Sequence, residues 1–338
     1  MPEPSPTPAR RGRLLRFGAA VAVLFALAGY LAVQYLTGGA GTPRCRVVSG
    51  KGDDASYEFT PEQAVNAATI SAVGTSRGLP ERAVAIALAT ALQESGLHNI
   101  RHGDRDSLGL FQQRPSQGWG TTKQIMDPTY AAGVFYEHLA KVSGYTRLPL
   151  TVAAQRVQRS GYPQAYAKHE PDATMLAAAL TGRAAATLTC EGRPGTTPPG
   201  GPDSVRAALV RDFGHEVLQD AGADVSAQDA SPAPDGTSSP SSPSTASGAA
   251  SGAPSSTVSA RTVTVPVRKD PSTGKGVRGW ELAHWAVANS SALHIERVSY
   301  AGREWTAGRR EGEWLRSGAQ GAPAAKEAAT EVRIVTAQ

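Results

Sequence analysis

The stretch 221–260 limits most strongly what this chain of 338 residues can fold into. It contains no lysine, arginine or aromatic residue and consists almost entirely of Ser, Ala, Pro, Gly and Thr with a few Asp. Such a composition cannot bury enough apolar surface to offset the loss of chain entropy on folding. We therefore predict a disordered linker here, which separates a larger folded region from a small C-terminal module at 261–338.

An apolar run at residues 17–36 predicts a transmembrane helix, because about 20 residues span a bilayer. The segment 1–16 before it is basic and carries Arg10, Arg11, Arg13 and Arg16. This asymmetry predicts a cytoplasmic basic arm and a single-pass protein of the cell membrane whose bulk is extracytoplasmic. The alternative is a secreted protein, released after cleavage of a signal peptide.

The charge of the remaining chain is nearly balanced. The formal net charge is +5, and the basic arm accounts for much of it. An excess this small does not suggest binding to nucleic acid. We expect no nucleic-acid partner, and no motif in the sequence indicates a cofactor.

Helix signals dominate residues 45–190. Thr60 followed by Pro61 predicts an N-cap and a helix start, and Gly78 predicts its end. Further helices are predicted from Pro80 to Gly96, from Asp127 to about Lys141, and after Pro149 and Pro163. Another, amphipathic helix is predicted at 203–220, where apolar residues recur every fourth position at Val205, Leu209, Phe213 and Val217. The predicted fold class is mainly α, with an all-α domain at 45–190.

The module at 261–338 has a different pattern. "RTVTVPVR", "IERVSYAGREWTA", "GEWLR" and "EVRIVTA" read as strands and a hairpin, and residues 279–292 read as a helix. This predicts a small α+β module. We expect its four tryptophans to fill its core, since a module this small needs large side chains, and its partner is not indicated by the sequence.

The chain has two cysteines, Cys45 and Cys190, and both fall in the part predicted to be exported. Outside the cytoplasm two such thiols tend to oxidise, so we predict a disulfide that joins the two ends of the helical domain.

Glu94 is the candidate catalytic residue. It ends a predicted helix below a stripe of small residues formed by Thr90, Ala87 and Ala83. A carboxyl group that is moved out of water favours its neutral form, which is the form that a general acid needs. Such an acid can protonate a glycosidic oxygen.

The residues around Glu94 form a recognisable pattern. "ES" at Glu94–Ser95, then Ser107, "GLFQ" at 109–112 and Pro115 follow one another in this order. The pattern resembles the lytic transglycosylases of the lysozyme-like superfamily, whose sequences read ES, S, GLMQ and P. The resemblance covers roughly residues 55–179, and "YAAGVFYEHL" at 130–139 is similar to the family's following helix. It implies a lysozyme-like fold and an activity on the glycan strands of peptidoglycan.

The resemblance also implies roles for single residues. Glu94 becomes the acid/base, and the residues that line the glycan groove become Ser107, Gly109, Phe111 and Gln112. The family's AYN segment is not reproduced, because Gln155 and Gln158 stand near the positions of its tyrosine and asparagine. We expect Gln158 to bind substrate, and Tyr162 or Tyr166 to supply the phenol; Tyr162 is the substrate-binding candidate.

The reaction type stays open between hydrolysis by a muramidase and lytic transglycosylation. Hydrolysis with inversion needs a second carboxylate across the groove, and Asp104 or Asp106 is the candidate. Transglycosylation does not, because the substrate's own acetamido oxygen can stabilise the developing cation. The same turn could also be read as a metal site with His98 and His102, but an irregular loop without a thiol does not favour one, and we expect no metal.

The sequence therefore predicts a membrane-anchored extracytoplasmic enzyme that cleaves peptidoglycan. Two other functions remain open. The first is a non-catalytic protein that binds peptidoglycan, and the second is an envelope scaffold that acts through its C-terminal module.

Overall fold

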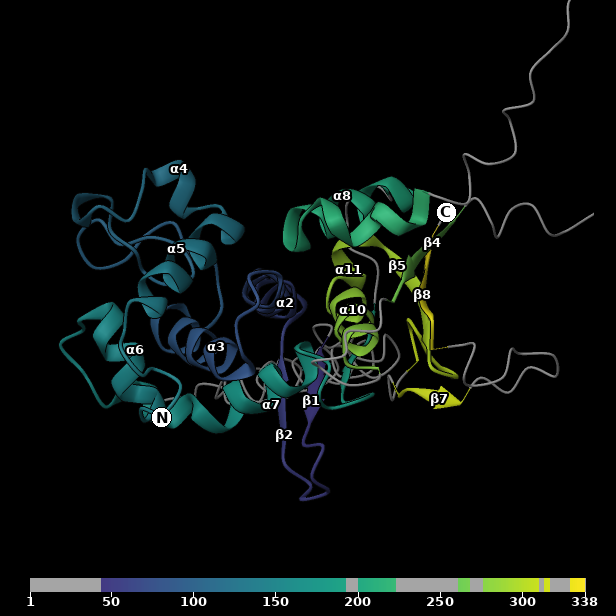
Figure 1. Ribbon diagram of the computed structural model, residues 1–338, viewed down its shortest axis with the longest axis horizontal. Helices are drawn as coiled ribbons and strands as arrows, with labels where there is room; N and C mark the ends of the chain where they lie inside the picture. Colours follow the sequence, from purple (N-terminus) through teal and green to yellow (C-terminus); the bar gives the residue numbers. More distant parts are fainter. Residues whose placement is uncertain are drawn as a thin grey trace, which may run out of the picture. The chain divides into compact units, whose positions relative to one another are not determined.

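The computed structural model describes residues 44–192, 200–222, 261–267, 276–309, 313–316 and 329–337 (Figure 1). These residues form an α+β fold with two antiparallel sheets, in the orders β2-β1-β3 and β4-β8-β5-β6-β7. The predicted mainly α fold class, with an all-α domain, is therefore wrong. The first sheet lies within residues 45–190, the range that was expected to contain helices alone.

The first sheet brings the two cysteines together. Strand β1 (Cys45–Val48) pairs with β2 (Ser56–Phe59) on one side and with β3 (Leu188–Cys190) on the other. Cys45 and Cys190 are direct partners in the register and form the predicted disulfide, with an S–S distance of 2.00 Å. The strands are only three or four residues long, too short for the alternation of apolar and polar residues to identify a strand.

The helices that follow begin and end close to the predicted residues. Helix α2 (Pro61–Ser76) starts with a capping box, in which Thr60 and Gln63 satisfy each other's backbone N–H groups. Helix α3 (Glu81–Ser95) ends at Gly96, which adopts the left-handed conformation that favours glycine at this position. The predicted starts and stops of both helices are confirmed.

The rest of the helical part is built from shorter elements. They are η1 (Pro115–Gln117), α4 (Thr122–Ile125), α5 (Pro128–Ala140), α6 (Leu150–Gln158), η2 (Ala165–His169) and α7 (Glu170–Leu180). The predicted amphipathic helix is α8 (Gly201–Phe213), followed by η3 (His215–Gly222). Val205, Leu209 and Phe213 are buried, as the sequence pattern predicted. This face of α8 packs against α2 and against the C-terminal strand β4.

The C-terminal residues form the five-stranded sheet and two helices. The strands are β4 (Thr262–Pro266), β5 (Ile295–Tyr300), β6 (Arg303–Thr306), β7 (Leu315–Arg316) and β8 (Glu331–Thr336), and the helices are α10 (Val277–Ala288) and α11 (Ser290–Leu293). These elements match the predicted strands, hairpin and helix. All four tryptophans of this region are at most 7% exposed, which confirms that they fill the core.

Helix α10 lies between the helical part of the chain and the five-stranded sheet (Figure 1). It contacts α2 and α7 on one side and β5 and β8 on the other. The approach to α7 is close at Gly182, where a Cβ atom would come within 1.9 Å of the Val277 carbonyl oxygen. The described residues from 44 onward accordingly form one compact unit.

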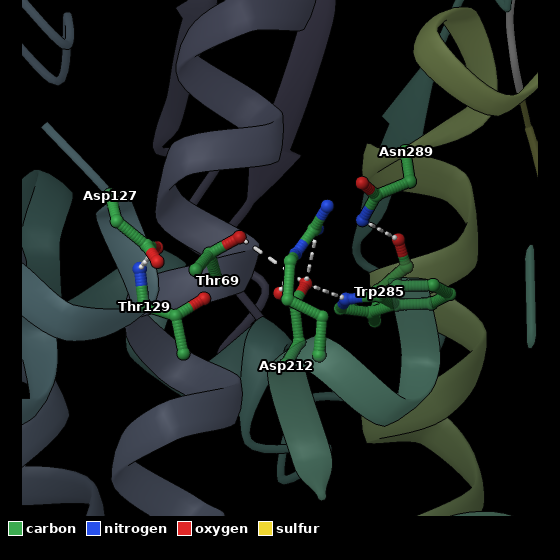
Figure 2. Close-up of polar contacts among 7 residues, drawn as sticks. Thr69, Asp127, Thr129, Asp212, Trp285 and Asn289 are labelled. Carbon is green, nitrogen blue, oxygen red and sulfur yellow. Dashed lines mark hydrogen bonds and ion pairs between the residues drawn. The ribbon is translucent and has the colours of Figure 1, made fainter. Parts of the chain in front are cut away.

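Three indole N–H groups bind residues that lie earlier in the chain. Trp305 donates to the Cys190 carbonyl at 3.1 Å, and Trp314 donates to the Leu188 carbonyl at 3.0 Å. Both acceptors belong to β3, so the C-terminal region rests directly on the strand that carries the disulfide. The third donor is Trp285, which binds the buried carboxylate of Asp212 (Figure 2).

Several predicted segments lie outside the described residues. They are the basic arm 1–16, the transmembrane segment 17–36 and nearly all of the linker 221–260. Across the described part of the chain, no helix combines the length and the apolar character needed to cross a membrane.

Candidate functional site

Glu94 lies one residue before the end of α3 and is half-buried. Its Oε1 atom accepts a hydrogen bond of 2.7 Å from the hydroxyl group of Tyr166, which is fully buried in η2. Burial raises the pKa of Tyr166 above its usual value, and the negative charge of Glu94 and their hydrogen bond raise it further. Tyr166 therefore stays protonated and holds one oxygen of the Glu94 carboxyl group in a fixed direction.

A tight loop at residues 108–113 lies beside the end of α3. Leu108 and Gln113 exchange two backbone hydrogen bonds, of 2.9 and 3.0 Å, which close the loop. Gly109 has a φ of +74°, and a Cβ atom there would come within 2.8 Å of the Ile125 carbonyl oxygen. Only glycine fits this position, which explains one letter of the "GLFQ" pattern in terms of backbone geometry.

Two side chains fix the loop to the helices around it. Ser95, the residue after Glu94, donates to the Leu110 carbonyl at 2.8 Å. Gln158, at the end of α6, donates to the next carbonyl, that of Phe111, also at 2.8 Å. The loop is thus held from both sides at two consecutive peptide groups, and one of its two supports is the neighbour of Glu94.

The four residues predicted to line the groove are buried or half-buried in the loop and its supports. Phe111 is fully buried and stacks on Phe135, with ring centroids 4.6 Å apart, so its ring supports the loop from inside. Ser107 is also buried. Gln112 is half-buried and donates to the Gly109 carbonyl at 3.2 Å. Gly109 is buried in the turn itself.

The two candidate second carboxylates have other surroundings. One oxygen of Asp106 accepts from the Arg114 Nε atom at 2.7 Å, and the other accepts from the Ser116 backbone N–H at 2.9 Å. The hydrogen bonds from Ser116 and Arg114 hold the pKa of Asp106 well below its usual value. Asp104 is 94% exposed and lies 4.0 Å from Arg105. Asp106 therefore stabilises the loop as a carboxylate, and Asp104 points into solvent.

The residues of the alternative metal site are not gathered around one point. His98 pairs through Nδ1 with Glu62 on α2, at 3.1 Å. Within the described ranges, no group of three or more His, Cys, Asp or Glu side chains is arranged to hold a metal ion.

The structure distinguishes the two tyrosines that the sequence left open. Tyr166 contacts Glu94, whereas Tyr162, the residue chosen for substrate binding, is 79% exposed. The sequence did not single out Ser95 as a support of the loop. The position of Ser95 directly after Glu94, at the end of a predicted helix, could have indicated this role, because a side chain at a helix end can reach the loop that follows.

Comparison with models of protein families gave no match, and comparison with curated proteins gave no significant match. The functional interpretation therefore depends on the sequence pattern and on the geometry around Glu94.

Proposed function

We propose that this protein cleaves the glycan strands of peptidoglycan outside the cytoplasm, with Glu94 as the general acid/base. The observation that carries the proposal is the hydrogen bond of 2.7 Å from the buried Tyr166 hydroxyl to Glu94. A general acid must present its proton in a defined direction, and a donor bound to one carboxyl oxygen leaves the other for the substrate. The fixed loop beside it, anchored by Ser95 and Gln158, supplies a rigid backbone next to the acid.

The proposed reaction is lytic transglycosylation. Glu94 would protonate the glycosidic oxygen as the bond to the sugar breaks, and the acetamido oxygen of the substrate would stabilise the cation that develops. Glu94 would then remove a proton from a hydroxyl group of the same sugar, which closes an anhydro ring. The state of Asp104 and Asp106 favours this route over hydrolysis with a second carboxylate, because one is in solvent and the other binds Arg114 and Ser116.

The disulfide supports the proposed location. Cys45 and Cys190 are bonded to each other, and stable disulfides are typical of proteins outside the reducing cytoplasm. Peptidoglycan is found there, so the compartment and the substrate agree.

The test is digestion of purified peptidoglycan by the full-length chain, followed by mass analysis of the fragments. We expect anhydro ends with the wild type and none with Glu94→Gln, which keeps the shape of the side chain but cannot act as an acid. The matched control is Glu137→Gln, which changes an exposed glutamate paired with Arg77 on the same helical part. Intact glycan with the wild type, or equal cleavage by Glu94→Gln, would exclude the proposed catalytic role. Intact glycan with the wild type, together with tight binding of the wild type to the glycan, would indicate a non-catalytic peptidoglycan-binding protein.

A further inference from the structure

The chain reverses direction immediately after Glu94 and Ser95. Gly96 and Leu97 both have a φ of +63°, so two consecutive residues adopt the left-handed conformation. This conformation suits glycine, but it is costly for leucine, whose Cβ atom crowds the backbone. A residue keeps such a strained backbone only where its surroundings fix it. The turn at Gly96 and Leu97 must therefore be held by other parts of the protein.

Two amide side chains of α2 hold this turn, and we call Gln63 and Asn66 the amide pair. Gln63 donates from Nε2 to the Gly96 carbonyl at 2.7 Å, and Asn66 donates from Nδ2 to the Leu97 carbonyl at 2.8 Å. Asn66 is 6% exposed, and Leu97 is completely buried. The two donors lie three residues apart on α2, on neighbouring positions of the helix surface. The amide pair thus binds two consecutive carbonyl groups of the turn.

The three residues that follow Glu94 are each bound to another element. Ser95 is bound to the loop, and Gly96 and Leu97 are bound to the amide pair. The hydrogen bond from Tyr166 fixes one oxygen of the Glu94 carboxyl group. The place from which this side chain extends depends on the end of α3, which the other bonds hold. Fixing the backbone and fixing the carboxyl group are therefore separate tasks, carried out by different residues.

We infer that Gln63 and Asn66 are positioning residues for Glu94, which keep the end of α3 in a constant place beside the loop. This inference rests on the proposed function and adds to its site two residues that act through the backbone. A displacement of about 1 Å in a reacting group can lower a rate about a hundredfold. The amide pair lies 33 and 31 residues before the carbonyl groups that it binds, so the pattern around Glu94 did not indicate it.

Gln63 allows this role to be tested without disrupting the start of α2. Its Oε1 atom accepts from the Thr60 N–H at 2.7 Å in the capping box, while its Nε2 atom binds the Gly96 carbonyl. Gln63→Glu keeps the acceptor of the capping box and removes the donor to the turn. The assay is digestion of purified peptidoglycan by the full-length chain, with release of anhydro fragments as the rate. We expect kcat to fall roughly tenfold and KM to stay unchanged.

Gln124→Glu is the matched control. Gln124 has the same position in the capping box of α4, where its Oε1 atom accepts from the Thr121 N–H at 2.9 Å. This variant introduces the same charge at a second helix start and should keep the wild-type kcat.

Asn66→Ala is the second test variant, because it removes the other donor of the amide pair. It should lower kcat by a similar factor. Since Asn66 is buried, its kcat is calculated per folded molecule, with the folded fraction taken from urea unfolding.

Four results would overturn the inference. Wild-type kcat in both Gln63→Glu and Asn66→Ala excludes the positioning role, while cleavage by the wild type would still support Glu94 as the acid. An equal loss in Gln124→Glu assigns the effect to the added charge. A loss confined to KM shows that the amide pair affects substrate binding instead of the position of the acid. Intact glycan with the wild type overturns the proposed function and this inference with it.

Discussion

The carboxylate of Asp212 accepts a hydrogen bond of 2.8 Å from the indole N–H of Trp285, a residue 73 positions later in the chain (Figure 2). The same oxygen also accepts from the Thr69 hydroxyl at 3.2 Å, and Arg211 pairs with the other oxygen at 2.8 Å. The side chain of Asp212 is completely buried. One carboxylate on α8 therefore joins α2, an early helix, to α10 in the C-terminal region.

Replacement of Asp212 should destabilise the whole unit. Asp212→Ala would leave the buried N–H of Trp285 and the hydroxyl of Thr69 without their acceptor, which costs about 3 kcal/mol in total. Urea unfolding, followed by tryptophan fluorescence, measures this change in the free energy of unfolding. Asp203→Ala is the control, because it removes an exposed partner of Arg206 on the same helix and should have little effect. Equal stabilities of the two variants would contradict the role given to Asp212.

Tyr166 is expected to act as a positioning residue for Glu94. Tyr166→Phe removes the hydrogen bond to the carboxyl group but keeps the buried ring, so cleavage should fall roughly tenfold. The reduction should appear in kcat, while KM stays unchanged, because the hydroxyl group binds Glu94 and not the sugar. Tyr136→Phe is the control: it also removes a buried hydroxyl group, one that binds the Ile70 carbonyl, and should lower stability without lowering kcat of the folded protein. A loss confined to KM would show that Tyr166 contacts substrate directly.

Stability should depend on the protonation of His284. This histidine is completely buried on α10, with Nδ1 2.7 Å from the Ala179 carbonyl of α7 and with the rings of Trp280 and Trp314 beside it. Burial lowers its pKa from 6.5 to about 4. Because the unfolded state takes up the proton first, the free energy of unfolding should decrease as the pH falls from about 6.5 to about 4, by up to about 3 kcal/mol.

The contribution of His284 can be separated from that of the carboxyl groups that titrate in the same range. The other residues on α10 with charged side chains are Arg278 and Glu281, which pair with each other at 2.8 Å and are present in both the wild type and His284→Gln. The decrease in stability between pH 6.5 and 4 should be smaller in His284→Gln than in the wild type. His98→Gln, which changes a half-exposed histidine on the surface, should keep the wild-type decrease. Parallel curves for wild type and His284→Gln would refute the prediction.

The disulfide should contribute strongly to stability. It joins residues 145 positions apart, and closing a loop of this length restricts the unfolded chain by up to about 5 kcal/mol. A variant with Ala at both Cys45 and Cys190 should therefore unfold at a lower urea concentration. Added reductant should lower the midpoint of the wild type and leave that of the double variant unchanged. A common midpoint for the oxidised wild type and the double variant would show that the bond has no net effect.

The helices could be predicted from the sequence because their ends carry local signals. Thr60, Pro61 and Gly96 act on the nearest backbone groups, so short windows of sequence are enough to place α2 and α3. The first sheet could not be predicted in this way. The two cysteines indicated that these ends of the chain meet, but strands β1 and β3 pair across a separation of 145 residues, and no local pattern showed that the cysteines lie on strands. The amphipathic pattern of α8 predicted a packed face, but its partners depend on the tertiary structure.

The candidate site was predictable in part. The order of Glu94, Ser95 and "GLFQ" indicated that the loop lies beside the acid, and the bond from Ser95 to the Leu110 carbonyl agrees. Sequence could not tell Tyr162 from Tyr166, because both follow α6 and their orientation depends on the turn between them. It also assigned Phe111 to the groove, whereas the ring faces the core against Phe135. Spacing identifies which residues are near, but packing decides which way each one points.

Strand β8 (Glu331–Thr336) pairs with β4 on one side and β5 on the other, so the strand that follows the other four in sequence occupies an interior place in the sheet. The sheet can therefore be completed only after residues 331–336 have been synthesised. Until then α10 lacks β8, one of the strands that it contacts, and β4 has no neighbour in the sheet. A stop codon before residue 331 would delete this inner strand, and the damage would reach α2 and α7 through their contacts with α10.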